Sequence, residues 1–460
     1  MKIAKKRLRH AVARFKQDFA DQPTRALDDL LPHDMVCTMV DEEVGAYRER
    51  IYPPLTTLGL FIGQALSADG ACQDAVARYQ SERSAHGARP CSFNSGPYCK
   101  ARRRLPLSLI ERLASSVGER LEVMSRLSWK WRGRSVKLLD GTTISMPDTE
   151  ANQAAYPQSG EQQPGLGFPL AMLVALISLS TGAVLRWASG PCRGKGSGEQ
   201  ALFRSLIPHL SLGDIILVDR FHCTYFTIAM LSLHGVDILT RQHHRRITDF
   251  RQGHHLGHRD QLVTWHCPQR PDWMDHETYA HMPKQLTVRQ IEVAGRVLVT
   301  TLTDAQSVSP LDLDRLYRQR WQVEVDLRSI KAVMGMDILR AQSPHMIDKE
   351  MAVYLLAYNL VRGLMVRAAA GANRIARALS FKATLQLFMA FQPQLHRAVG
   401  KRADLIRTHL LPAVSTMILP IRPGRVEPRA IKRRPKNHAL LTVPRYVARA
   451  AIIHTHRSYA

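Results

Sequence analysis

The stretch that decides the fold is LAMLVALISLSTGAVLRWASG, residues 170–190, in which two apolar runs flank Thr181-Gly182. Short apolar runs bounded by turn residues are typical of buried β-strands. The uninterrupted apolar run from Phe168 to Ser180 has 13 residues, whereas a membrane span needs about 20. The pattern therefore predicts a buried antiparallel hairpin and excludes a membrane helix here.

On both sides of this hairpin the chain alternates between strand and helix patterns. SVKLLD ends in Asp140 and is followed by Gly-Thr-Thr, which predicts a strand that ends at Asp140 and then turns. DIILVD, after the hairpin, likewise ends in Asp219. The predicted elements are strand 135–140, the hairpin, helix 198–210, strand 214–219, helix 223–233 and strand 236–240. This order predicts an α/β fold with a mixed five-stranded sheet.

The rest of the chain has a different character. Residues 1–130 read as mainly helical, with basic segments at 2–16 and in YCKARRRLP. The polar segment after residue 241 contains three strand patterns, QLVTWHCP, LTVRQIEVA and RVLVTTLT, and helical patterns resume at Pro310. We therefore divide the chain into segments 1–130, 131–240, 241–305, 306–370 and 371–460.

The charge of the chain is strongly basic. It has 64 Lys and Arg against 39 Asp and Glu, a net charge of +25. Such an excess favours a polyanionic partner, and without a spanning segment that partner is nucleic acid rather than a membrane. The basic N-terminus lacks the apolar core of a secretory signal. Seven scattered cysteines, none in a C-x2-C pair, are typical of a reducing cytoplasm and argue against a disulfide framework.

Two acids occupy related positions in the predicted sheet. Asp140 and Asp219 each follow a buried strand, and ligands gather at strand ends in α/β sheets. On adjacent strands their carboxylates would repel each other unless a cation neutralised them. With Glu324 from a later helix they would form an all-oxygen site of the kind that suits Mg²⁺ or Mn²⁺. The alternative is that each aspartate only forms a turn.

That later helix reads LYRQRWQVEVDLRSIKAVMG, residues 316–335. At 100° per residue its polar side chains fall within about 60° of one another, beside a separate apolar stripe. The polar stripe consists of Tyr317, Arg320, Glu324 and Lys331, and the apolar stripe of Leu316, Val323, Leu327, Ile330 and Met334. The polar stripe is either an ordinary solvated face or a face that binds a ligand.

Together these residues resemble a known family. Asp140 in LLDGTT, Asp219 in ILVDR and the spacing Y-x2-R-x3-E-x6-K are similar to the DDE transposases of bacterial insertion sequences, in the branch marked by a YREK helix. The resemblance extends over about residues 90–370. It implies an RNase H-like catalytic core interrupted by a β-strand insertion, which would account for the 104 residues (220 to 323) between Asp219 and Glu324.

The resemblance also implies roles for individual residues. Asp140, Asp219 and Glu324 would be the catalytic acids and hold two Mg²⁺ or Mn²⁺ ions, while Tyr317, Arg320 and Lys331 would bind DNA. The implied partners are the terminal inverted repeats of an insertion sequence and a target DNA, bound by a homodimer in a synaptic complex in the bacterial cytoplasm. Family members hold a flipped base with an aromatic residue from the insertion. Trp265 or Trp273 are the candidates, although packing is the simpler explanation for each.

Three further segments carry weaker signals. GKGSGE lacks the G-x4-G-K-[ST] spacing of a phosphate-binding loop, so we expect a turn and a helix start with Ser197 as a cap. The histidine-rich segment 243–258 lacks paired cysteines. We expect it to form a basic surface with nearby arginines, and not a zinc site. These arginines are Arg241, Arg245, Arg246 and Arg251. The basic tail 422–436 is either a solvated end or a DNA-binding arm.

Three functions remain open from the sequence. The first is a transposase that cuts and joins DNA by metal-dependent phosphoryl transfer. The second is a nuclease on the same fold that cuts without joining. The third is a DNA-binding regulator of transposition with an inactive catalytic domain, against which the intact acid triad argues. The sequence leaves open the repeat sequence, the target preference, a hairpin intermediate and the mobility of the element.

Overall fold

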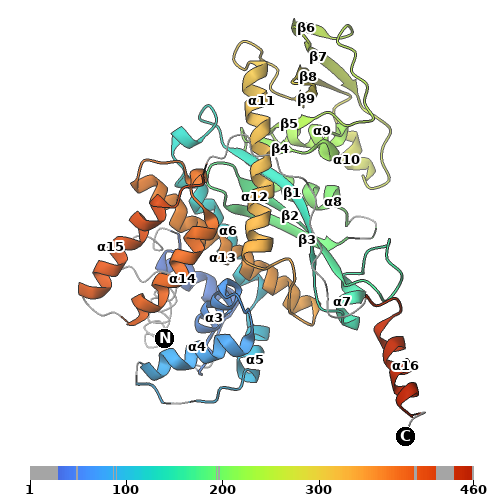
Figure 1. Cartoon of the computed structure of the whole chain (residues 1–460). Coiled ribbons are helices and arrows are strands. Elements are labelled where there is room, and N and C mark those ends of the chain that lie inside the picture. Colours follow the sequence, from blue (N-terminus) through green and yellow to red (C-terminus); the bar gives the residue numbers. More distant parts are fainter. Residues whose placement is uncertain are drawn as a thin grey trace.

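The computed structural model describes residues 30–47, 50–85, 87–89, 91–192, 194, 197–397, 401–420 and 440–457. A twisted β-sheet runs through the upper part of the molecule, and a helical layer packs beneath and beside it (Figure 1). Two predictions, the basic segment 2–16 and the basic tail 422–436, lie outside the described residues.

In the part of the chain that the structure describes, the sheet has nine strands in the order β3-β2-β1-β4-β5-β9-β8-β7-β6. β1 pairs antiparallel with β2 and parallel with β4, and β4 pairs parallel with β5. The first five strands are β1 (Val136–Ser145), β2 (Leu170–Ser178), β3 (Val184–Pro191), β4 (Ile215–Val218) and β5 (Asp237–Arg241). This mixed sheet confirms the α/β core, and the pairing of β2 with β3 confirms the hairpin.

The turn of that hairpin needs glycine for two reasons. Gly182 has a φ of +76°, which lies in the left-handed backbone region that residues other than glycine rarely adopt. A Cβ atom at this position would also lie 2.7 Å from the guanidinium carbon of Arg362. The Thr-Gly pair that marked the turn in the sequence therefore also lets a buried arginine approach the main chain.

Alternate side chains of the core strands enter different hydrophobic clusters, because successive residues of a strand point to opposite faces of the sheet. On β1 and β4, Leu138 and Leu217 belong to the cluster under the helical layer. Leu139 and Ile216 belong to the cluster on the other face. That second face is covered by α8 (Glu199–Leu206) and α9 (Tyr225–Leu233). Both faces of the sheet are thus buried, which explains the nearly continuous apolar runs in its strands.

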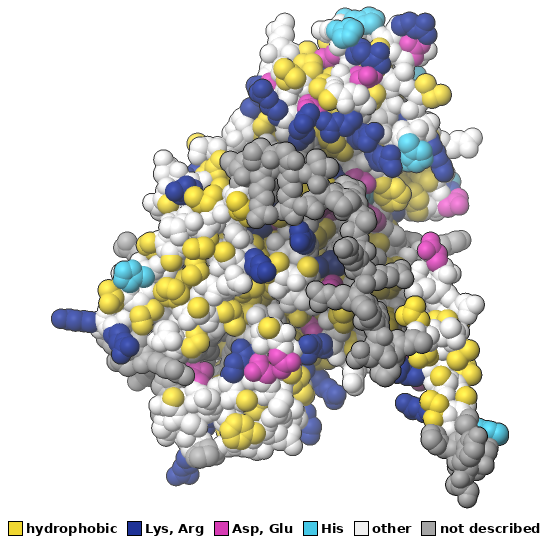
Figure 2. All heavy atoms as spheres, viewed as in Figure 1, with side chains coloured by type: hydrophobic (Ala, Val, Ile, Leu, Met, Phe, Trp, Pro, Cys, Tyr) yellow, Lys and Arg dark blue, Asp and Glu magenta, His cyan; other side chains and the backbone are white. Residues whose placement is uncertain are grey.

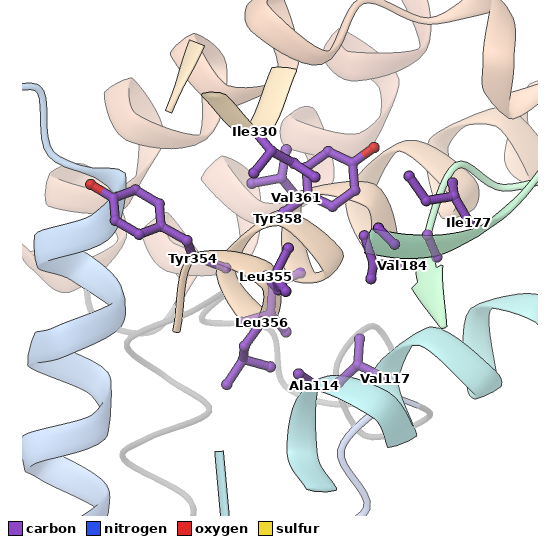
Figure 3. Packing of buried hydrophobic residues seen from close by; sticks show 14 of the residues in the cluster. Ala114, Val117, Ile177, Val184, Ile330, Tyr354, Leu355, Leu356, Tyr358 and Val361 are labelled. Carbon is purple, nitrogen blue, oxygen red and sulfur yellow. The ribbon is translucent and has the colours of Figure 1, made fainter. Parts of the chain in front are cut away.

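The helical layer is centred on α13 (Pro344–Gly371), a buried helix of 28 residues. Its Leu355 and Tyr358 pack near Val117 of α6 (Leu107–Val123) and Val184 of β3 (Figure 3). The other helices of this layer are α2 (His33–Glu43), α3 (Pro54–Leu66), α4 (Cys72–Ala85), α5 (Gly96–Arg104), α6 (Leu107–Val123), α14 (Phe381–Arg397) and α15 (Lys401–Thr416). α13 therefore joins the N-terminal helices to the sheet in one core.

The polar segment after residue 241 continues the same sheet. β6 (His254–Gly257), β7 (Asp260–His266), β8 (Gln285–Val293) and β9 (Arg296–Thr300) form an antiparallel meander. β9 joins this meander to the core by pairing antiparallel with β5. Three of these strands were predicted, whereas β6 was not, because its histidine-rich sequence lacks an apolar alternation.

The cysteines are all free, as expected for a chain without a disulfide framework. Cys223 is buried, and the other six are partly exposed, among them two that lie beside one arginine. Arg102 Nη2 lies 3.0 Å from Cys72 Sγ and 3.9 Å from Cys99 Sγ. A hydrogen bond from Cys72, together with the charge of Arg102, lowers the pKa of Cys99 to about 6, while the same pairing raises the pKa of Cys72.

We therefore expect Cys99 to be alkylated at lower pH than the other cysteines. The thiolate is the nucleophile, and a lowered pKa means that it is present above about pH 6 rather than above the usual value of about 8.5. Iodoacetamide labelling followed by peptide mass spectrometry across pH 5–9 would measure this. C72A removes the hydrogen-bond donor and should move the Cys99 profile to higher pH. A Cys99 profile with a midpoint above pH 8 in the unmodified protein would contradict the assignment.

Candidate functional site

Asp140 lies within β1 beside the point where the neighbouring parallel strand β4 ends, and Asp219 directly follows β4. The parallel pairing of β1 with β4 places Leu138 beside Leu217, and each aspartate lies two residues further on. Adjacent strands are about 4.8 Å apart, so the two carboxylates project side by side from one face. Asp219 begins a 3-10 turn, Arg220–His222, in which its Oδ1 accepts a hydrogen bond from the main-chain N–H of Phe221 at 2.9 Å.

The prediction that the first strand ends at Asp140 is wrong. β1 continues through Gly141, Thr142 and Thr143 to Ser145, because β2 pairs with it along this whole length. Only the parallel partner β4 stops, and this leaves one side of β1 open at Asp140. The aspartate therefore lies in the middle of a strand, at the point where the sheet opens.

Glu324 lies on a helix that the sequence predicted as regular, and this prediction is also wrong in part. The segment divides into α11 (Pro310–Arg318), a 3-10 turn (Gln319–Trp321), α12 (Gln322–Arg328) and a π-helical turn (Ser329–Val333). The π-turn changes the helical repeat from Ser329 onward, which includes Lys331, whereas Arg320 and Glu324 precede it and form an ion pair one turn apart. The apolar stripe is confirmed, since all five of its side chains are buried.

Arg320 links Asp140 to Glu324. Its Nη1 lies 3.6 Å from Asp140 Oδ2 and its Nη2 lies 2.9 Å from Glu324 Oε1. Burial raises the pKa of Asp140 to about 6, and the nearby carboxylates of Glu199 and Asp219 add to this effect, whereas Arg320 and the Gly141 N–H oppose it. The ionised form of Asp140 is thus costly here, and a positive charge beside it would relieve that cost.

The two remaining residues of the predicted stripe have different surroundings. Tyr317 is 8% exposed and packs in the core, and burial raises its pKa. Lys331 donates hydrogen bonds to Thr142 Oγ1 at 2.9 Å and to the Thr143 carbonyl at 2.8 Å. The lysine therefore ties the π-turn to β1 two residues beyond Asp140, and burial lowers its pKa.

A cleft of about 400 Å³ is lined by Asp140, Glu324, Lys331 and Asp337 among others, whereas Asp219, Arg320 and Tyr317 are not part of its lining. Among the described residues, no three His, Cys, Asp or Glu side chains already lie close enough together to hold a metal ion. The chemistry of the donors nevertheless fits a hard divalent cation, because the side chains are carboxylates, and a cation beside Asp140 would offset the burial that raises its pKa.

The sequence reasoning missed one pair of polar residues beside Asp140. The Glu199 carboxylate lies against Gly141, and its Oε1 is 3.0 Å from Nε2 of the buried His222. The predicted Ser197 cap is wrong, since Gly198 is the N-cap of α8 and Ser197 Oγ instead donates to the Gly194 carbonyl. Glu199, the first residue of α8, belongs to no motif that the sequence could reveal.

The tryptophans and arginines of the insertion form a separate surface. Trp265 is 8% exposed and packs in the second cluster, and Arg246 stacks on its ring at 3.8 Å from the centroid. Trp273 is 45% exposed, with Arg204 at 3.8 Å from its ring centroid. The four arginines expected on a basic surface are exposed, and Figure 2 shows Lys and Arg side chains gathered over this part of the molecule.

Comparison with known proteins bears on this geometry. The family described as "Transposase DDE domain" matches residues 131–360, which include both strand acids and Glu324. The transposase InsG for insertion sequence element IS4, from Escherichia coli (strain K12), is 26% identical over 437 residues, covering 91% of this chain and 94% of InsG. A piggyBac transposase, in a synaptic complex with hairpin DNA, superposes with a TM-score of 0.44 at 10% identity, covering 87% of this chain and 86% of that one.

Proposed function

Because the chain belongs to the family of transposases with a DDE domain, it is a DNA transposase, and we propose that it binds the terminal inverted repeats of an insertion sequence, cuts the DNA there and joins the ends to a target. One observation carries the choice of site. Asp140 and Asp219 leave adjacent parallel strands in register, and Glu324 is joined to Asp140 through Arg320.

In the proposed reaction the three acids are the catalytic carboxylates and would hold two Mg²⁺ or Mn²⁺ ions. Such ions, when bound, activate the attacking hydroxyl and stabilise the oxyanion that departs from phosphorus. The protein supplies the positions of the carboxylates. The N–H of Gly141 orients Asp140, the N–H of Phe221 orients Asp219, and α12 presents Glu324 from above the sheet.

Arg320 and Lys331 are proposed to hold phosphates of the bound DNA end. In the free protein the Arg320 guanidinium lies between two of the acids, where it balances their charge. Its planar fork would suit a phosphate that it could bind with two hydrogen bonds if the charge of the acids were balanced in another way. Lys331 reaches the same cleft from the π-turn.

We expect R320A to slow cleavage of bound ends about 100-fold and K331A about 10-fold, because the arginine can bond two phosphate oxygens and the lysine only presents a point charge. Y317F should change the rate less than about threefold, since Tyr317 is a core residue. Single-turnover cleavage of pre-bound DNA would give these rates, with thermal melting as the control for folding. If R320A and K331A both cleave at the rate of the unmodified protein, Arg320 and Lys331 have no role in the reaction.

The test of the function uses the DNA that flanks this gene. A duplex ending in the matched repeats found there, incubated with the protein and Mg²⁺, should be cut to a free 3′-hydroxyl and then joined to a supercoiled plasmid. Cutting without joining would support the nuclease alternative. Repeat binding without either reaction would support the regulator.

DNA affinity should depend steeply on salt, since each phosphate neutralised contributes about −0.9 to the slope of log K against log salt. Replacing Arg245 and Arg246 with Ala should reduce that slope by about 1.8 if each meets one phosphate. The matched control replaces the exposed Arg374 and Lys382, which lie on the helical side. Fluorescence anisotropy at three or more salt concentrations gives the slopes. Equal slopes for both double variants would remove the basic surface of the insertion from the DNA contact.

We further propose a homodimer that holds two ends in a synaptic complex, and a place of action in the bacterial cytoplasm, where the element's DNA is. Among the described residues, no helix has the length and apolar character that crossing a membrane requires.

A further inference from the structure

We propose that Glu199 and His222 form a positioning pair that holds the two strand acids at their working separation from behind the sheet. This inference rests on the proposed function, because it concerns how Asp140 and Asp219 receive their cation. The family match includes both residues within its span but assigns neither a role.

The first step concerns the two faces of β1. Asp140 projects toward α12 and the cleft, so its neighbour Gly141 presents its Cα to the opposite face, where α8 lies. A Cβ atom on Gly141 would be 2.7 Å from Cδ and 2.9 Å from Cγ of Glu199. The Glu199 side chain therefore rests directly on the main chain that carries Asp140, in a space that only glycine leaves open.

The second step concerns the turn that carries Asp219. Three residues beyond that acid, His222 ends the 3-10 turn with its ring 1% exposed and its Nε2 bonded to Glu199 Oε1 at 3.0 Å. The ring also packs edge-on against Phe203 of α8, at 5.0 Å between centroids. Gln200 adds a hydrogen bond from its side-chain N–H to the Phe221 carbonyl, at 2.9 Å. The start of α8 is thus joined to the turn after Asp219 at three points.

The state of the histidine follows from its buried ring. His222 Nδ1 is buried without a hydrogen-bond partner. An unpaired N–H donor in that position would be costly, whereas a bare ring nitrogen costs less, so the proton belongs on Nε2 and is donated to Glu199. The Glu199–His222 bond is therefore a directed link that fixes the ring, and through it the turn, against α8.

Together these contacts make Glu199 a bridge between the two acids. It touches the strand residue next to Asp140 on one side and a residue of the Asp219 turn on the other, where β1 and β4 no longer pair. No strand hydrogen bond sets the distance between the acids at this point. The carboxylate of Glu199 acts through its neighbours, as outer-shell partners of metal ligands do when they orient a ligand, with effects on affinity of 10–100-fold.

The test measures Mn²⁺ binding by electron paramagnetic resonance, on the protein alone and on its complex with the repeat duplex, and then the Mn²⁺ dependence of cleavage. E199A should weaken Mn²⁺ binding about tenfold or more, raise the Mn²⁺ concentration that half-saturates cleavage equally, and recover most of the maximal rate at saturation. E199Q keeps an oxygen that accepts from His222, so its Mn²⁺ affinity should stay within about threefold. The matched control, E150A, changes the exposed first residue of another helix, α7 (Glu150–Ala155).

A double-mutant cycle tests the contact with the strand. G141A should weaken Mn²⁺ binding, because the added methyl group pushes the Glu199 side chain away. In the E199A background the methyl group has room, so G141A should weaken Mn²⁺ binding little further. Mn²⁺ affinity of E199A equal to that of E150A would overturn the proposal, as would equal damage in E199Q and E199A. Failure of the unmodified protein to bind Mn²⁺ and to cleave would instead contradict the proposed function.

Discussion

D140N, D219N and E324Q are each expected to lose DNA cleavage and joining by at least about 10³-fold while repeat binding persists. Each change removes a negative charge that would hold a cation, and loss of several kcal/mol of transition-state stabilisation corresponds to a factor of this size. Affinity for DNA comes mainly from phosphate contacts elsewhere, so it should stay within a few-fold or rise slightly as repulsion falls. Cleavage of labelled repeat duplex and its binding by gel shift measure the two effects separately.

The cleft itself offers the control for this experiment. Asp337 lines the same cleft, and its main-chain carbonyl accepts a hydrogen bond from the hydroxyl of Ser145, five residues beyond Asp140 on β1. D337N should therefore cleave at nearly the unmodified rate. Mg²⁺-dependent cleavage retained in one of the three acid variants would remove that residue from the site.

The second large effect is on stability, and we expect it from D326A. Asp326 is fully buried on α12, two residues from Glu324, and its carboxylate pairs with Arg362 of α13 and with Arg377. Arg377 Nη1 lies 2.6 Å from both carboxylate oxygens. Removing one partner of a buried charge pair leaves the others uncompensated and costs about 3–5 kcal/mol.

The two arginines explain why the cost would extend beyond one ion pair. Arg377 also donates to the carbonyls of Leu179 and Ser178, and Arg362 donates to Tyr358, so the network attaches α12 to the hairpin and to α13. Urea unfolding of D326A compared with unmodified protein measures the loss. E292A, which breaks the exposed pair with Arg259, should cost no more than about 1 kcal/mol. If D326A lowers the free energy of unfolding as little as E292A does, the network does not hold α12 in place.

Much of the core could be predicted from the sequence because its strands are buried on both faces. Continuous apolar runs such as 170–178 and 215–218 have few alternative explanations, and their order specifies the sheet. β6 could not be predicted, since an exposed edge strand rich in histidine carries no apolar pattern. The end of β1 was misplaced because Gly-Thr-Thr resembles a turn, whereas pairing with β2, a contact distant in sequence, extends the strand.

The candidate site shows the same limit. The three acids could be found because two follow buried strands and the third belongs to a spaced motif. The division of the helix into 3-10 and π turns could not be predicted from the spacing of its side chains, and neither could the low exposure of Tyr317. The proposed role of Glu199 could not be predicted from the sequence, because it depends on contacts with Gly141 and His222 that form only in the folded chain.

The most direct test of the account is X-ray diffraction at the manganese absorption edge from crystals of the protein with its repeat duplex and Mn²⁺. The account predicts an anomalous peak within bonding distance of the carboxylates of Asp140 and Asp219, with Glu324 beside it and Arg320 turned toward a DNA phosphate. Well-ordered density in which these carboxylates contact no manganese, while manganese and the cleaved strand lie elsewhere on the protein, would contradict it.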